Sequence, residues 1–101
     1  NPAYSSPISH AISLIDMASH IYRIDISKAF GVRNPLLEEA VALSIKNEPE
    51  AKKKVQQVLR STGQIKKIKA ALENLKGKDK RVLYHSEFTT EDVDYALSLL
   101  S

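Results

Sequence analysis

Three of the four prolines stand where a helix is expected to begin. Pro7 follows Ser6, Pro35 follows Asn34, and Pro49 opens a third segment. Serine and asparagine side chains accept hydrogen bonds from the free N–H groups of a first helical turn, and proline at the next position has no N–H to leave unpaired. After each of these starts, aliphatic residues recur at three- and four-residue intervals, the period of an amphipathic helix. The sequence therefore predicts helices through most of its first half.

The second half continues the same pattern. Ser61-Thr62-Gly63 predicts a break with a new hydroxyl cap, Gly77 predicts the end of the helix that follows, and Thr89-Thr90-Glu91-Asp92 predicts a last helix start. The segment 77–88 is expected to be a loop, with an isolated strand at Val82-Leu83-Tyr84 as the alternative. The expected helices are 7–23, a short turn from Asp25 to Phe30 ended by Gly31, 34–46, one from Pro49, 64–76 and one from Thr89. We expect an all-α fold: a single domain over 1–101 that forms a compact bundle of five or six helices.

Composition limits the chemistry and the compartment. The core must be built from aliphatic side chains, because the 101 residues include four Tyr, two Phe and no Trp. The chain has no cysteine, which excludes disulfides, thiolate metal sites and thiol nucleophiles. A reducing cytoplasm is the compartment that fits. No apolar stretch is long enough to cross a bilayer, so we expect no membrane partner.

Positive charge is concentrated in one half of the chain. Between Lys52 and Arg81 there are eleven bases and only two acids, Glu73 and Asp79, a formal charge of +9, whereas residues 1–50 hold four bases and six acids, a charge of −2. A one-sided positive field attracts a polyanion such as nucleic acid. The candidate nucleic-acid-binding residues are Lys52, Lys53, Lys54, Arg60, Lys66, Lys67, Lys69, Lys76, Lys78, Lys80 and Arg81.

The kind of base indicates the kind of contact. Lysine suits nonspecific contacts with phosphates, whereas arginine is favoured for bidentate reading of guanine edges, and only two of these eleven residues are arginines. The pattern does not distinguish RNA from DNA. A solvated cationic face, or a basic face that docks an acidic protein in an adaptor or regulator, is the alternative interpretation. Among the aromatic residues, which are expected to be mainly packing residues, Tyr84 is the first candidate for stacking on a base.

No residue set predicts catalysis or a bound metal. His10, His20 and His85 are the only histidines, and the Asp16 and His20 pair, four residues apart, has no third ligand at a supporting spacing. No serine lies in a nucleophile motif, and Gly77-Lys78 lacks the rest of a phosphate-binding loop. We expect a protein that is not an enzyme, with no cofactor and no small-molecule substrate.

One resemblance is local. The stretch Phe88-Thr-Thr-Glu-Asp-Val-Asp-Tyr-Ala-Leu97 resembles the final helix of a histone fold, which implies a DNA-binding protein as an alternative. A histone fold also requires a long central helix before this stretch, and Ser61-Thr62-Gly63 and Gly77 interrupt that region.

A second resemblance spans most of the chain. Tyr22-Arg-Ile-Asp-Ile-Ser-Lys-Ala-Phe30 leads into a helix around Leu36-Leu-Glu-Glu-Ala-Val41, and a basic helical half follows. In size, helix order and charge the chain is similar to the small subunits of archaeal type I-A CRISPR interference complexes. That resemblance implies a noncatalytic subunit of a crRNA-guided ribonucleoprotein complex. Such a subunit adjoins other subunits and copies of itself, and it stabilises the target or displaced DNA strand while guide pairing reads the sequence.

Overall fold

The expected all-α fold is confirmed. A computed structural model describes residues 6–26, 30 and 34–100, and within these ranges there are six helices and no strand. The helices are α1 (Pro7–Ile21), α3 (Pro35–Leu43), α4 (Glu48–Thr62), α5 (Ile65–Lys76), α6 (Lys80–Tyr84) and α7 (Thr90–Leu99). The short turn expected at 25–31 lies mostly outside the described residues.

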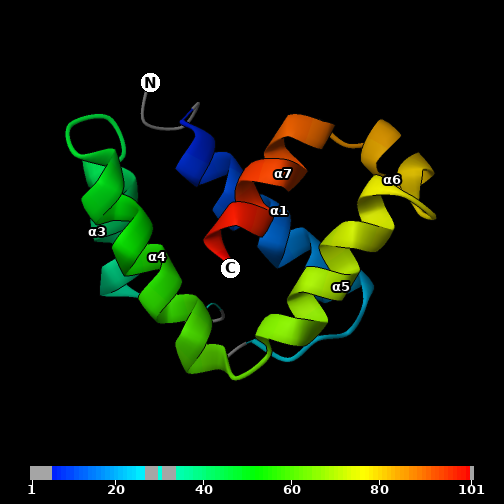
Figure 1. Ribbon diagram of the computed structural model, residues 1–101, viewed down its shortest axis with the longest axis horizontal. Helices are drawn as coiled ribbons and strands as arrows, with labels where there is room; N and C mark the ends of the chain where they lie inside the picture. The colour runs from blue at the N-terminus through cyan, green and yellow to red at the C-terminus, as the bar shows by residue number, and fades with distance from the viewer. Residues whose placement is uncertain (1–5, 27–29, 31–33, 101) are drawn as a thin grey trace.

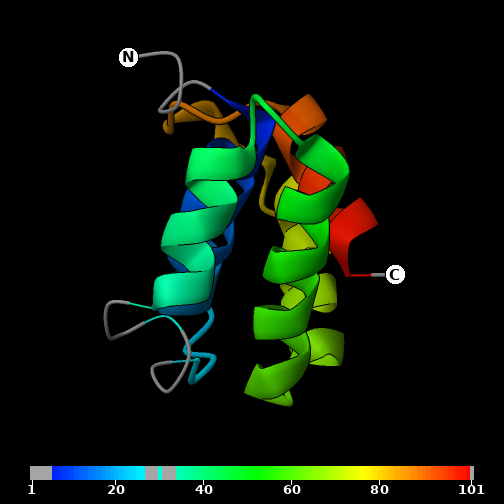
Figure 2. The same cartoon turned by 90° about the vertical axis from the view of Figure 1, so that its left-hand side faces the viewer.

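The helices form two units that meet at the core (Figure 1). Helices α3 and α4 pack against each other as a hairpin and lie side by side in Figure 2. Helices α1, α5 and α7 pack together, and α6 packs on α5. Helices α4 and α5 are consecutive in the chain, yet they diverge from the turn at Gly63, with α7 between them (Figure 1). The outer surfaces of α4 and α5 therefore point in different directions.

Side-chain caps fix the helix starts that the prolines predict. Ser6 Oγ accepts a hydrogen bond from Ser9 N at 3.2 Å, and Asn34 Oδ1 accepts one from Leu36 N at 2.9 Å. Helix α4 begins one residue before Pro49, because Asn47 caps it by accepting from Glu50 N. Thr89 and Asp92 form a reciprocal capping box at the start of α7. These starts are local features, and the sequence predicts them to within a residue.

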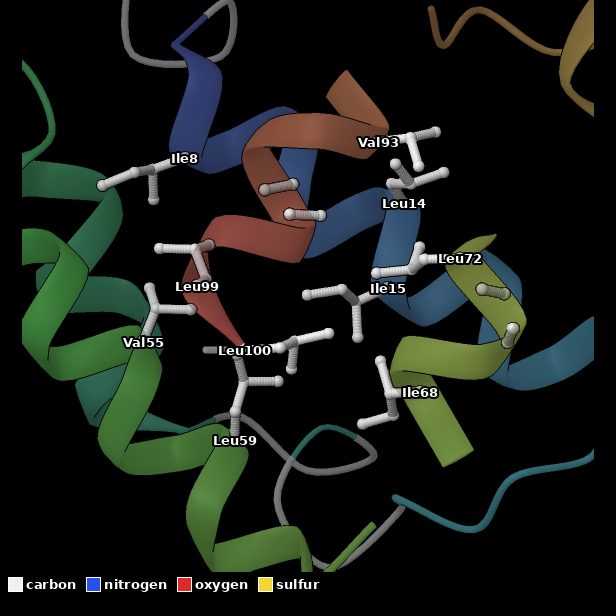
Figure 3. Close-up of a cluster of buried hydrophobic side chains, with 14 of the residues drawn as sticks. Ile8, Leu14, Ile15, Val55, Leu59, Ile68, Leu72, Val93, Leu99 and Leu100 are labelled. Carbon is white, nitrogen blue, oxygen red and sulfur yellow. The ribbon is translucent and has the colours of Figure 1, made fainter. Parts of the chain in front are cut away.

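The core is aliphatic, as the composition predicts. Buried side chains from α1, α4, α5 and α7 form one cluster (Figure 3). Leu99 and Leu100 bring the end of α7 into this cluster, between the diverging helices α4 and α5 (Figures 1 and 3). Leu14 is fully buried in this cluster, whereas Ile21 at the end of α1 is 43% exposed.

The break between α4 and α5 is confirmed, but its mechanism differs from the expected hydroxyl cap. Ser61 and Thr62 belong to the last turn of α4, where their hydroxyls donate to Val58 O and Leu59 O at 2.6 Å each. Gly63 then adopts φ 68°, a left-handed conformation that glycine reaches at little cost. Helix α5 starts without a side-chain cap. The glycine, not a new cap, therefore makes the break.

The expected loop at 77–88 is wrong in part, because residues 80–84 form helix α6. Val82 N donates to Asp79 O at 2.9 Å, and His85 N donates to Arg81 O at 3.1 Å. Leu83 turns inward and is 5% exposed, whereas Tyr84 beside it is 85% exposed. An apolar run of three residues is too short to show a helical period, so the burial of Leu83 decides the conformation.

Arg23 is strained at the end of α1. It has φ 55°, the only positive φ among the described non-glycine residues. Ile24 N donates to Ser19 O and Tyr22 N to Ala18 O, both at 2.9 Å, the pattern of a helix end that usually contains glycine. A left-handed conformation costs an L-residue roughly 1–2 kcal/mol.

Arg23→Gly is therefore expected to stabilise the fold by about 0.5–1 kcal/mol, since glycine relieves the strain but loses more backbone entropy on folding. Urea denaturation of the two proteins measures the difference. Arg23→Ala, which removes the side chain and keeps the strain, is the control and should gain nothing. An equal gain from both variants would assign the effect to the arginine side chain instead.

Candidate nucleic-acid interface

The three consecutive lysines of α4 point to different sides of the helix. Lys52 Nζ lies 3.5 Å from Glu48 Oε1 and 5.1 Å from the ring centre of Tyr95 on α7. Lys54 Nζ lies 3.0 Å from Glu39 Oε2 on α3. Lys53 is exposed between them. Two of the three ammonium groups therefore hold α4 to its neighbours and are already paired with carboxylates.

Tyr95 strengthens the contact between α4 and α7. Its hydroxyl donates to Glu48 Oε1 at 3.2 Å, so Tyr95, Glu48 and Lys52 form one polar cluster. Burial, with the neighbouring Glu48 carboxylate, raises the pKa of Tyr95 to about 12. The phenol therefore keeps its proton, and its role as a donor, well above neutral pH. Lys52 is accordingly a structural residue of this cluster.

The α3–α4 hairpin as a whole is close to neutral. Arg60 is exposed and lies on the same side of α4 as Lys53, opposite the buried Val55 and Leu59. Residues 34–62 nevertheless hold five bases and four acids, a net charge of +1. Two of these acids, Glu38 and Glu39, come from α3. The net charge of the folded hairpin is therefore much smaller than the number of lysines on α4 suggests.

Helix α5 carries its lysines around a buried apolar stripe. Ile68, Leu72 and Leu75 are fully buried. Lys66, Lys67 and Lys69 are exposed and take part in no ion pair within the described ranges. Lys66 and Lys67 also line a shallow hollow of about 430 Å³ at the turn around Gly63. Helix α5 is therefore cationic over its outer surface.

Lys76 differs from the other α5 lysines. Its ammonium group pairs with the Asp94 carboxylate of α7. Glu73 is exposed on the same helix and lowers the local charge further. The last turn of α5 is thus less positive than its first two turns.

The basic residues that follow α5 lie on a short segment, and a polar contact holds this segment to α1. Lys78, Lys80 and Arg81 are exposed at the α5–α6 turn and on α6. The acid among them, Asp79, accepts a hydrogen bond from the Tyr22 hydroxyl at the end of α1. Burial and this contact with Asp79 raise the pKa of Tyr22 to about 12, so the phenol remains the donor at neutral pH. The contact fixes the start of α6 to α1.

The fold thus divides the eleven predicted residues into two groups, four on α4 and seven on α5, α6 and the turn between them. Lys52, Lys53, Lys54 and Arg60 belong to the nearly neutral hairpin. Residues 65–85 hold seven bases and two acids, a net charge of +5. We call Lys66, Lys67, Lys69, Lys78, Lys80 and Arg81 the α5–α6 basic segment. All six are exposed, and none makes an ion pair within the part of the chain that the structure describes.

Two of the three histidines have structural neighbours. His10 Nδ1 lies 3.5 Å from Asp92 Oδ1, and its ring packs edge-on against Phe88. His20 Nδ1 lies 3.0 Å from the backbone oxygen of Asp16, and 3.8 Å from its carboxylate. Among the described residues, no three His, Asp or Glu side chains are grouped so that they could share a metal ion. Within the same ranges, no helix has both the length and the apolar character needed to cross a bilayer.

A long central helix of the histone type is also missing from the described residues. Helices α1 and α4 are the longest there, at 15 residues each, and α4 and α5 are separate helices that diverge at Gly63. The local likeness of 88–97 to a histone helix therefore reflects a shared capping pattern. It does not extend to the fold.

Comparison of the chain with known protein families, with curated protein sequences and with solved structures finds no match.

Proposed function

We propose that this chain is a noncatalytic helical subunit that contacts nucleic acid through the α5–α6 basic segment. The observation that carries the proposal is a local contrast in charge: +5 over residues 65–85, which include α5 and α6, against +1 over the α3–α4 hairpin. A cationic surface without paired carboxylates gains free energy by releasing the counterions that surround a polyanion. The contact is nonspecific, because five of the six residues are lysines, which act as point charges on phosphates.

The length of the segment sets the number of contacts. From Lys66 to its last residue α5 is about 15 Å long at the usual helical rise, and Lys78, Lys80 and Arg81 continue the segment beyond it. Phosphates of one strand follow each other about every 3.4 Å along a B-form duplex, so roughly four of them fit beside α5. Four neutralised phosphates predict a plot of log affinity against log salt with a slope of about −3 to −3.6.

The salt dependence tests the proposal. Affinities for single- and double-stranded DNA and RNA are measured by fluorescence anisotropy between about 50 and 200 mM salt, with protein that has first been treated with nuclease. We expect the affinity to fall with the slope given above. A flat dependence, or no binding, would refute nucleic-acid contact, and binding only to acidic proteins would favour the adaptor interpretation of the same surface.

The assembly in this proposal comes from the sequence resemblance. In a CRISPR RNA-guided interference complex the guide reads the sequence by base pairing, and a protein subunit needs only to hold the target or displaced strand by its backbone. A lysine-rich helix suits that task. The partners in this proposal are crRNA-guided nucleic acid, other subunits of the complex and copies of the chain itself. Isolation of the native protein with its companions, followed by identification of the bound RNA, tests this part separately.

A further inference from the structure

A hollow between α6 and α7 lies directly beside the basic residues of α6. It has a volume of about 270 Å³. Leu83 and Phe88, both packed on the core, form its apolar floor, and Lys80, Tyr84 and Thr90 lie at its edge. The hollow therefore combines an apolar floor with polar groups at the rim.

Tyr84 is the unusual member of this group. It is 85% exposed, the highest exposure among the large hydrophobic side chains of the described residues. Tyr22 and Tyr95, by contrast, are partly buried and donate their hydroxyls to carboxylates. The Tyr84 hydroxyl makes no hydrogen bond within the described ranges. Packing therefore does not account for the position of this ring.

Lys80 and Tyr84 lie side by side on α6. They are four residues apart on one helix, so their side chains share a face. Lys80 is exposed and makes no ion pair with the described residues. An aromatic ring next to a free ammonium group is the combination that holds one nucleotide of a single strand, with the base on the ring and the phosphate on the cation.

The start of α7 decides which part of the nucleotide enters the hollow. The Asp92 carboxylate accepts from Thr89 N, 3.0 Å away, and Glu91 is exposed in the same turn. These acids repel a phosphate from the α7 side. The neutral base therefore faces α7, and the phosphate lies on the side of Lys80 and Arg81.

We infer that Tyr84 and the hollow beside it form a stacking subsite for an unpaired nucleobase of DNA or RNA. The inference rests on the proposed function, because the α5–α6 basic segment supplies the contacts to the phosphates of the same strand. It adds a preference for single strands, since the bases of a duplex are already stacked on each other. DNA and RNA both offer a planar base to the ring. The test therefore uses oligothymidylate for DNA and oligouridylate for RNA.

The chain offers a clean reporter for this subsite because it contains no tryptophan. In Tyr84→Trp the new indole is the only one. We expect single-stranded oligothymidylate and oligouridylate to quench its emission, whereas an abasic oligonucleotide of equal length, with the same phosphates, leaves it unchanged. Equal quenching by the abasic oligonucleotide would overturn the stacking subsite.

Measured affinities of Tyr84 variants for the two oligonucleotides test the stacking subsite separately from the proposed function. Tyr84→Ala is expected to weaken binding of oligothymidylate by about 5- to 100-fold, to leave binding of the abasic oligonucleotide unchanged, and to keep the salt slope. Tyr84→Phe keeps a ring and should retain affinity. If Tyr84→Ala binds oligothymidylate as the unaltered protein does, the subsite is wrong and the basic segment still stands. If the unaltered protein binds neither oligonucleotide, both ideas fail.

Discussion

Replacing Lys66, Lys67 and Lys69 together with glutamate is expected to abolish nucleic-acid binding at about 100 mM salt. Each reversal removes an attraction and adds a repulsion on the outer surface of α5. With roughly four phosphates beside this helix, the loss of three contacts lowers the magnitude of the salt slope by about 2 to 3. The fold should persist, since all three side chains are exposed and have no ion-pair partner among the described residues. Anisotropy titration measures the binding, and circular dichroism checks the helicity.

The α3–α4 hairpin provides a matched control. Lys46, Lys53 and Arg60 are also exposed and make no ion pair with a described residue. Their replacement by glutamate changes the net charge by the same amount as the triple replacement on α5. Because these residues lie on the hairpin, we expect this variant to keep most of its affinity. Equal losses in the two triple variants would mean that binding follows net charge alone, which would contradict an interface on α5 and α6.

Ile68→Ala is expected to destabilise the fold by about 2–5 kcal/mol, the largest stability change that we predict. Ile68 is fully buried in the cluster that joins α5 to α1 and α7. Truncation removes buried methyl groups and leaves a cavity that the neighbouring helices fill only in part. Since small domains are stable by roughly 5–15 kcal/mol, this one change removes a large share of the total. Urea denaturation measures it.

Ile65 is the matched position for this second test. It lies on the same helix and has the same side chain, but it is only partly buried at the edge of the core. Ile65→Ala should therefore cost clearly less than Ile68→Ala. If the two substitutions cost the same, α5 is oriented differently from the structure, and its lysines would then not share an outward surface either.

Local signals account for most of the helices. Ser6 with Pro7, and Asn34 with Pro35, cap their own helices through bonds within four residues, so no distant contact is needed to place those starts. The stripe of Ile68, Leu72 and Leu75 predicts both the buried side of α5 and the outward direction of its lysines. Helix α6 was missed for the opposite reason. Its five residues carry no period, and the burial of Leu83 stabilises it.

The α5–α6 basic segment has fewer residues than the eleven predicted from the sequence. A count of charges along the chain does not show which bases pair with acids from distant segments. Lys54 meets Glu39 of α3, and Lys76 meets Asp94 of α7, pairs separated by 15 and 18 positions. The exposure of Tyr84 likewise depends on the tertiary structure, since the sequence Leu83-Tyr84 fits a buried tyrosine as well as an exposed one.

The amino-acid pattern alone determined that the chain is helical, where most helices begin, and that positive charge gathers in its second half, because caps, helical period and composition act over a few residues. Only the tertiary structure decided how α4 and α5 diverge, which lysines are neutralised, and that Tyr84 stands beside a free cation. Those outcomes depend on which distant helices share the core, and hence on side chains that meet across the fold.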